Sequence, residues 1–237
     1  MLVVVARRSD QRARDLAKRW APYGGAVLTC EDLSVAGWRQ LLGDPEASKV
    51  VIEGQVVEAR EITGVLTLLP YVTESELVRI ARENRPYVAA EMTAFLHFWL
   101  SSLQCPVLNR PTPVCLTGPG WRREQWVYVA AQLGIPVQTV AWHLDHEVGV
   151  PEKEESSAPD MTVTIVGSRC LGSAEGTFVS HVRRLASAAR VEMLAGYFRE
   201  TETGFRLYNA DSSRANISSP EVADAILEYF LVRSVRC

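Results

Sequence analysis

The chain is poor in lysine. Among its 25 basic residues only Lys18, Lys49 and Lys153 are lysines, and the other 22 are arginines. Acidic residues number 28, so the formal net charge is −3. Binding to nucleic acid or to an anionic membrane needs a net basic surface. The balance of charge therefore argues against either as the main partner.

The sequence also lacks paired cysteines and a long apolar run. Its five cysteines include no CxxC pair, and an odd number does not fit a disulfide framework, so we expect a cytoplasmic protein. Met1–Ala6 is too short for a signal-peptide core. The most apolar expected helix, Val88–Leu103, contains Glu91 and His97 and is too short and polar to cross a bilayer.

A glycine fingerprint for dinucleotides is missing as well. Leu2–Ala6 and Ala26–Cys30 predict buried strands, and Asp10 predicts the cap of a helix that ends near Trp20. This strand–helix–strand order indicates a Rossmann-like layer. Its first turn, Ala6–Asp10, contains no glycine, so dinucleotide binding is not expected there.

Helices and strands alternate along most of the remaining chain. Glu53-Gly54 predicts a hairpin turn between residues 50–52 and 55–57. The acidic stretch 143–160 has the composition of a linker. The other expected helices are Glu74–Glu83, Pro86–Gln104, Trp121–Leu133, Thr177–Arg190 and Pro220–Val232, and the other expected strands are Gly64–Leu69, Pro136–Trp142, Thr162–Val166, Cys170–Ser173, Val191–Phe198 and Phe205–Tyr208.

Three segments carry a family resemblance. They are Arg85–Glu91 (RPYVAAE), Pro106–Pro111 (PVLNRP) and Leu133–Val137 (LGIPV). Together they resemble the first part of ATP-grasp ligases, in the branch that joins amino acids or peptides to a carboxylate. Val163–Leu231 resembles the end of the same fold.

The resemblance implies an α/β fold with two parts. Residues 1–142 would form a Rossmann-like pre-ATP-grasp domain, and residues 161–237 a reduced ATP-grasp C-terminal α+β subdomain. In the family, a subdomain that clamps the nucleotide lies between these parts. Here only the acidic linker 143–160 stands between them. The chain therefore resembles an internally truncated ATP-grasp protein.

The groups that the family uses for catalysis are also reduced. Family members hold the phosphates with two lysines, because phosphoryl transfer needs fixed positive charge. Lys153, in the linker, is the only lysine after residue 50. Tyr197 replaces an acidic metal ligand. Asn209 and Asp211 lie two residues apart on the last strand and remain as a weak relic of a metal site; a plain polar turn is the alternative interpretation.

A second candidate site begins within the resemblance segment PVLNRP and continues to the start of the next expected helix. Glycines at a helix start allow backbone amides to approach an anion, and arginines add fixed charge. The candidate ligand-binding residues are Asn109, Arg110, Gly118, Gly120, Arg122 and Arg123. The ordinary alternative is a capped helix with solvated arginines. We expect no catalytic residue in this set.

These observations favour binding over catalysis. The leading hypothesis is a degenerate, non-catalytic ATP-grasp-like protein that binds a partner protein or a peptide-like ligand in a peptide-modification pathway, without a cofactor. The alternative is an active ATP-dependent carboxylate–amine ligase, for which ATP and Mg would be the cofactors. A third hypothesis is a binder of a small anion at residues 118–123. A homodimer remains open.

Overall fold

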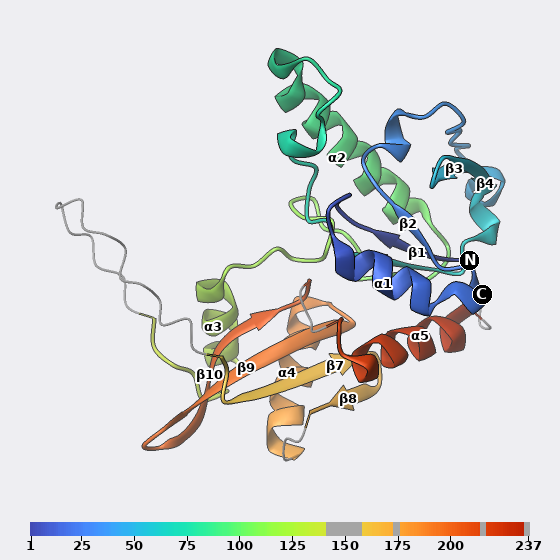
Figure 1. Ribbon diagram of the computed structural model, residues 1–237. Coiled ribbons are helices and arrows are strands. Elements are labelled where there is room, and N and C mark those ends of the chain that lie inside the picture. The colour runs from blue at the N-terminus through green and yellow to red at the C-terminus, as the bar shows by residue number, and fades with distance from the viewer. Residues whose placement is uncertain (141–157, 173–175, 214–216, 235–237) are drawn as a thin grey trace.

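The computed structural model describes residues 1–140, 158–172, 176–213 and 217–234 (Figure 1). Two four-stranded sheets and a hairpin form the β structure of these residues. The mixed α/β class expected from the sequence is confirmed. Most of the expected linker 143–160 lies outside the described residues. No helix among the described residues has the length and apolar character needed to cross a membrane.

The first sheet is parallel, and its order is β2-β1-β5-β6. Its strands form because short apolar runs are buried on both faces. Asp10 caps α1 by accepting a hydrogen bond from the Arg12 backbone N–H at 3.0 Å, as the sequence predicts. The elements are β1 (Leu2–Val5), α1 (Gln11–Arg19), β2 (Ala26–Leu28), β5 (Gly64–Thr67) and β6 (Val107–Leu108).

One face of this sheet packs against α2 (Arg85–Ser102), whose Leu96 and Trp99 are fully buried. The hairpin of β3 (Lys49–Ile52) and β4 (Gln55–Glu58) also packs on this side. The turn at Glu53-Gly54 is confirmed.

The expected helix Glu74–Glu83 is wrong. Its two ends form only short 3-10 turns, Glu74–Glu76 and Arg82–Asn84. In between, the guanidinium of Arg85 donates to the carbonyls of Ile80 (2.9 Å) and Val78 (3.3 Å). A helix would pair such carbonyls internally, so these local side-chain contacts compete with helix formation here.

The second sheet is antiparallel, and its order is β10-β9-β7-β8. Two helices, α3 and α4, cover one face of it and bury Trp126 and Leu185. The elements are α3 (Arg123–Gln132), β7 (Met161–Val166), β8 (Arg169–Leu171), α4 (Gly176–Ala189), β9 (Met193–Thr201), β10 (Gly204–Asp211) and α5 (Pro220–Ser234).

The segment after α3 also belongs to the second sheet. Val137 forms a single parallel bridge with Leu207, in place of the strand expected over Pro136–Trp142. Residues 141 and 142 lie outside the described part. Since α3 and Val137 both pack with β10, the chain passes to the second sheet before α3 begins.

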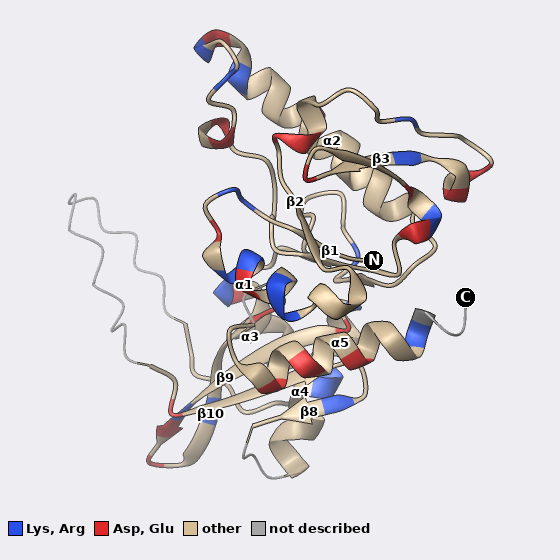
Figure 2. Ribbon diagram, turned by 45° about the vertical axis from the view of Figure 1, so that its right-hand side comes forward, with Lys and Arg blue, Asp and Glu red and all other residues tan. Residues whose placement is uncertain are grey.

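Helices α1 and α5 fill the space between the two sheets (Figure 1). The rings of Trp20 and Phe230 meet edge to face there, with centroids 6.0 Å apart. On the outer side of α5, where acidic residues gather (Figure 2), Asp224 pairs with Arg19 at 2.8 Å. The buried contact between Trp20 and Phe230 contributes more to joining the two halves than this ion pair, because an exposed ion pair adds little to the free energy of folding.

Candidate functional site

The central pocket lies at the carboxyl edge of the parallel sheet. We use this name for a cavity of about 670 Å³ lined by the residues that follow β1 and β5, by the loop after β6 and by the end of β10. Open α/β sheets bind ligands at this edge, because loops with exposed backbone groups converge there. The pocket brings together Gly120, Arg122, Arg123, Asn209 and Asp211, which are far apart in the sequence.

Arginines dominate the charge of the central pocket. Arg7, Arg12, Arg122 and Arg123 line it, together with the carboxylates of Asp10 and Asp211. Arg12 is neutralised locally, because its guanidinium binds both oxygens of Asp10, at 3.2 and 3.0 Å. Burial alone would raise the pKa of the Asp10 carboxyl, but the hydrogen bond and charge of Arg12 hold that pKa below its usual value.

The start of α3 positions two of these arginines. The backbone N–H of Arg122 donates to the side chain of Gln125 at 2.9 Å, which fixes the first turn. The Nε of Arg123 donates to the carbonyl of Tyr208 at 3.1 Å. Arg7 and Arg122 are exposed, and neither forms an ion pair with any residue that the structure describes. The charges of these two arginines are therefore not balanced by an ion pair within the described part of the chain.

Asn209 and Asp211 lie at the end of β10 and both line the central pocket. The oxygen of Asn209 accepts the adjacent Ala210 backbone N–H at 2.9 Å. One oxygen of Asp211 accepts the backbone N–H and the hydroxyl of Ser213, at 2.7 and 2.9 Å. Tyr197 lies opposite Asn209 in the sheet register.

These residues do not form a good site for magnesium. The Asn209 oxygen and one Asp211 oxygen are engaged by their own chain, whereas magnesium requires near-octahedral oxygen ligands. Among the described residues no group of three or more His, Cys, Asp or Glu side chains could hold a metal ion. The residues present at the end of β10 therefore fit a magnesium ion poorly.

The two glycines of the candidate site act through the backbone. Gly120 lines the central pocket with φ of 63°, and a Cβ there would lie 2.8 Å from the Cβ of Cys115. Gly118 is buried with φ of 114°, and its carbonyl accepts the hydroxyl of Thr112 at 2.7 Å. Both conformations favour glycine, but only Gly120 faces the cavity.

Asn109 and Arg110 lie outside the central pocket. Asn109 is 2% exposed, and its amide makes four hydrogen bonds of 2.9 Å to the backbone around β9 and β10. It thus joins the two halves of the protein and has no polar atom left for a ligand. Arg110 lines a different cavity, which contains Arg190, Tyr229 and Arg233.

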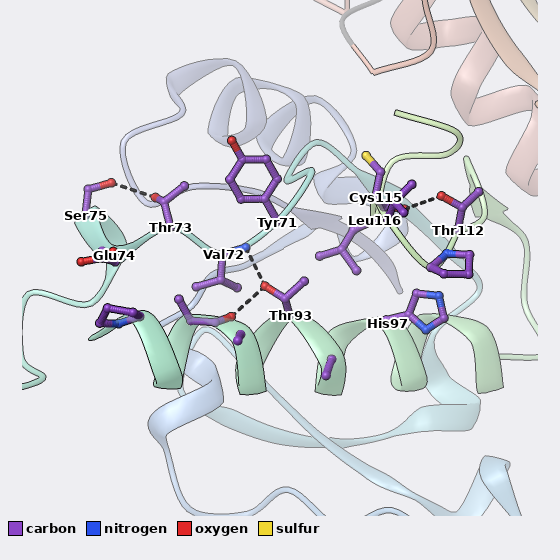
Figure 3. Close-up of a pocket in the computed structure, with 16 residues that line it drawn as sticks. Tyr71, Val72, Thr73, Glu74, Ser75, Thr93, His97, Thr112, Cys115 and Leu116 are labelled. Atoms are coloured by element: carbon purple, nitrogen blue, oxygen red, sulfur yellow. Dashed lines mark hydrogen bonds between the residues drawn. The ribbon is translucent and has the colours of Figure 1, made fainter. Parts of the chain in front are cut away.

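A second cavity, which we call the α2 groove, adjoins the central pocket. It encloses about 920 Å³ between α2 and the loops 71–75 and 112–116 (Figure 3). Thr93 anchors the first loop by accepting the Val72 backbone N–H at 3.0 Å. The side of the groove formed by α2 carries small side chains, at Ala89, Ala90 and Ala94. His97 lies near Thr112 at one end of the groove (Figure 3).

The groove and the pocket form one continuous surface. Tyr71, Val114 and Cys115 line both cavities. Tyr71 is 52% exposed and Val114 is 78% exposed, so both present apolar surface where the two cavities meet. Sequence reasoning missed the groove, although the small residues repeated along the predicted helix are a signal for it.

No protein-family model matches the chain, and neither does any curated protein sequence. Solved structures do match, and the class they define is the ATP-grasp ligase fold. The macrocyclase MdnC from Microcystis aeruginosa MRC, bound with precursor peptide MdnA, is 12% identical with a TM-score of 0.70, over 97% of this chain and 99% of that chain.

Two further structures are peptide-associated ligases. A Chryseobacterium gregarium RiPP-associated ATP-grasp ligase, in complex with ADP and a leader and core peptide, is 8% identical with a TM-score of 0.64, over 100% of this chain and 97% of that chain. The ATP-grasp ligase PsnB, complexed with minimal precursor, is 11% identical with a TM-score of 0.67, over 98% of both chains. The resemblance seen in the sequence is thus confirmed at the level of fold.

Proposed function

We propose that the chain is a non-catalytic ATP-grasp-like protein that binds a peptide-like ligand, free or as a segment of a partner protein, in a peptide-modification pathway. The observation that carries this proposal is the continuity of an apolar groove with an arginine-lined pocket. The ligand would lie along α2 and reach the carboxyl edge of the parallel sheet.

The two cavities suit the two kinds of group in a peptide. The α2 groove offers Ala90, Ala94 and Val114 to apolar side chains. Arg7 and Arg122 suit a carboxylate, since an arginine can donate two parallel hydrogen bonds to it. We therefore expect an extended peptide with apolar residues next to an acidic residue or a free C-terminus.

The chemistry of the central pocket favours binding over phosphoryl transfer. Catalysis would need fixed cations and metal ligands around the transferred phosphate. Lys153 is the only lysine after residue 50, and Asn209 and Asp211 are engaged by neighbouring backbone groups. In this respect the chain departs from a working ligase, while the fold it shares with peptide-bound ligases supports a peptide ligand.

A photo-crosslinking experiment tests the peptide site. A photoreactive amino acid would replace Val114, which borders both cavities, and in a matched control would replace Leu42, which is 86% exposed and far from them in the sequence. In the native cell we expect Val114, but not Leu42, to capture a peptide or a defined segment of a protein. The additional substitution Arg122→Glu should abolish capture, and equal capture from both positions would refute the site.

Nucleotide titration tests the non-catalytic part of the proposal. We expect no micromolar binding of ATP with magnesium in calorimetry. The alternative, an active carboxylate–amine ligase, is supported by the ADP and Mg bound to PsnB with its minimal precursor. It requires release of ADP and phosphate that depends on an amine acceptor and is lost in Asp211→Ala, and either result would overturn the proposal.

A further inference from the structure

A third cavity lies where the two halves of the chain meet. It encloses about 580 Å³ and is lined on one side by Gln104, Pro106, Val107 and Arg110, and on the other by Arg190, Glu192, Tyr229 and Arg233. We call it the Arg190 pocket. It shares no lining residue with the α2 groove or the central pocket.

Arg190 occupies a backbone position that favours glycine. It follows the last residue of α4 with φ of 54°, in the left-handed region. The backbone N–H of Val191 donates to the carbonyl of Ala186 at 3.0 Å, which is the bond that closes a helix with a left-handed residue. Such residues are mostly glycine, and a larger side chain there adds strain that often marks a functional site.

The side chain of Arg190 is available to a ligand. It is exposed, and its guanidinium makes no hydrogen bond or ion pair with any part of the chain that the structure describes. An arginine at a strained position therefore contributes charge to the cavity without a compensating contact from the described residues.

Two further arginines complete the charge of the Arg190 pocket. Arg233 contacts Glu192 at 3.3 Å and stacks on the ring of Tyr229, 4.8 Å from its centroid. Arg110 reaches only the carbonyls of Leu103 and Cys105, at 3.5 and 3.4 Å, which are long distances for hydrogen bonds. Three arginines against one glutamate leave two uncompensated positive charges.

Tyr229 adds a neutral donor to these cations. Burial, and next to it the charge of Glu192, raise the pKa of its phenol to about 12, while Arg233 and Arg110 act in the opposite direction. The hydroxyl therefore stays protonated at neutral pH.

We propose that the Arg190 pocket binds a phosphate-bearing anion at the joint between the two sheets, with Arg110 and Arg190 as the principal contacts. Guanidinium groups match the oxygens of phosphate with paired hydrogen bonds, and several arginines around one cavity are typical of phosphate recognition. Because Arg110 follows β6 of the first sheet and Arg190 lies between α4 and β9 of the second half, a bound anion would stabilise the packing of the two halves.

Titration with pyrophosphate tests this site. Calorimetry at constant ionic strength should give saturable binding, with inorganic phosphate weaker and citrate, a carboxylate of similar charge, weaker still. Arg110→Ala and Arg190→Gly should each weaken pyrophosphate binding roughly tenfold or more. The control Arg184→Ala removes an exposed arginine of α4 that does not line the pocket, and binding should be unchanged.

Arg190→Gly also separates binding from folding. Because glycine suits φ of 54°, the thermal unfolding midpoint of the Arg190→Gly variant without anion should equal or exceed that of the wild type. The stabilisation that pyrophosphate gives the wild type should be lost in this variant. The proposal is overturned if pyrophosphate fails to bind, if citrate binds as tightly, or if Arg190→Gly binds like the wild type.

Discussion

Asn109→Ala should weaken the connection between the two halves of the protein. The Asn109 amide donates to the carbonyls of Met193 and Ser212 and accepts the backbone N–H groups of Glu192 and Met193, each at 2.9 Å. Its partners lie 83 to 103 residues further along the chain. Truncation would leave these four backbone groups without the amide, in a position where Asn109 is 2% exposed.

The loss can be estimated from the number of bonds. A typical intramolecular hydrogen bond contributes about 0.5 to 1.5 kcal/mol net, so four bonds give roughly 2 to 6 kcal/mol. Most domains have about 5 to 15 kcal/mol of stability, so this is a large fraction. Asn109→Asp, which keeps the shape but replaces the donor by a carboxylate oxygen facing two carbonyls, should be at least as destabilising.

Urea unfolding followed by tryptophan fluorescence and circular dichroism measures the effect. Asn84→Ala is the control, because Asn84 is exposed and its side chain makes no capping hydrogen bond at the start of α2. We expect a change below about 0.5 kcal/mol for the control. A loss below about 1 kcal/mol in Asn109→Ala would refute the structural role and restore Asn109 as a candidate ligand residue.

Three further changes test the packing and the electrostatics. Gly64→Ala should cost about 1 to 3 kcal/mol in urea unfolding, because the new Cβ would lie 2.6 Å from the ring of Phe230. Asp10→Ala should cost about 0.5 to 2 kcal/mol at neutral pH and nothing in strong acid, because the lowered pKa of Asp10 stabilises the fold only where the carboxyl is ionised and this gain is lost as pH falls. Tyr229 should ionise near pH 12 in an absorbance titration. Stability should fall as pH rises from about 10 to about 12, because the folded state holds this proton more tightly than the unfolded state. A tyrosine that ionises near pH 10 in the wild type and disappears from the titration in Tyr229→Phe would contradict the burial of Tyr229.

Local sequence signals predicted most elements but not their partners. Helix α1 follows from Asp10 and the apolar spacing behind it, and both signals act within one turn. The expected helix Glu74–Glu83 does not form. Only Leu77 is buried in this segment, and the guanidinium of Arg85 donates to two of its carbonyls. The position of α3 on the second sheet depends on contacts with β10, which no local pattern encodes.

The sequence predicted several residues of the candidate site but not that they line one pocket. Arg122, Arg123, Asn209 and Asp211 were named for two separate sites, and the structure brings them to one pocket. Asn109 adjoins the same loop in sequence, but its partners near residues 193 and 212 could not be foreseen. A polar residue next to a buried strand can bind a ligand or join two layers, and only tertiary structure distinguishes the two.

Arg7 lies in the first turn of the parallel sheet, where the glycine fingerprint for dinucleotides is missing. Without glycines the turn Ala6–Asp10 cannot bring its backbone close to a dinucleotide, and Asp10 already caps α1. Yet the carboxyl edge of a parallel sheet still gathers the loops after β1, β5 and β6, whatever their sequences. Arg7, an exposed arginine in the first of these loops, therefore lines the same cavity as Arg122 in the third. Under the proposed function, this edge therefore binds a carboxylate through side-chain cations, which do not need close backbone approach.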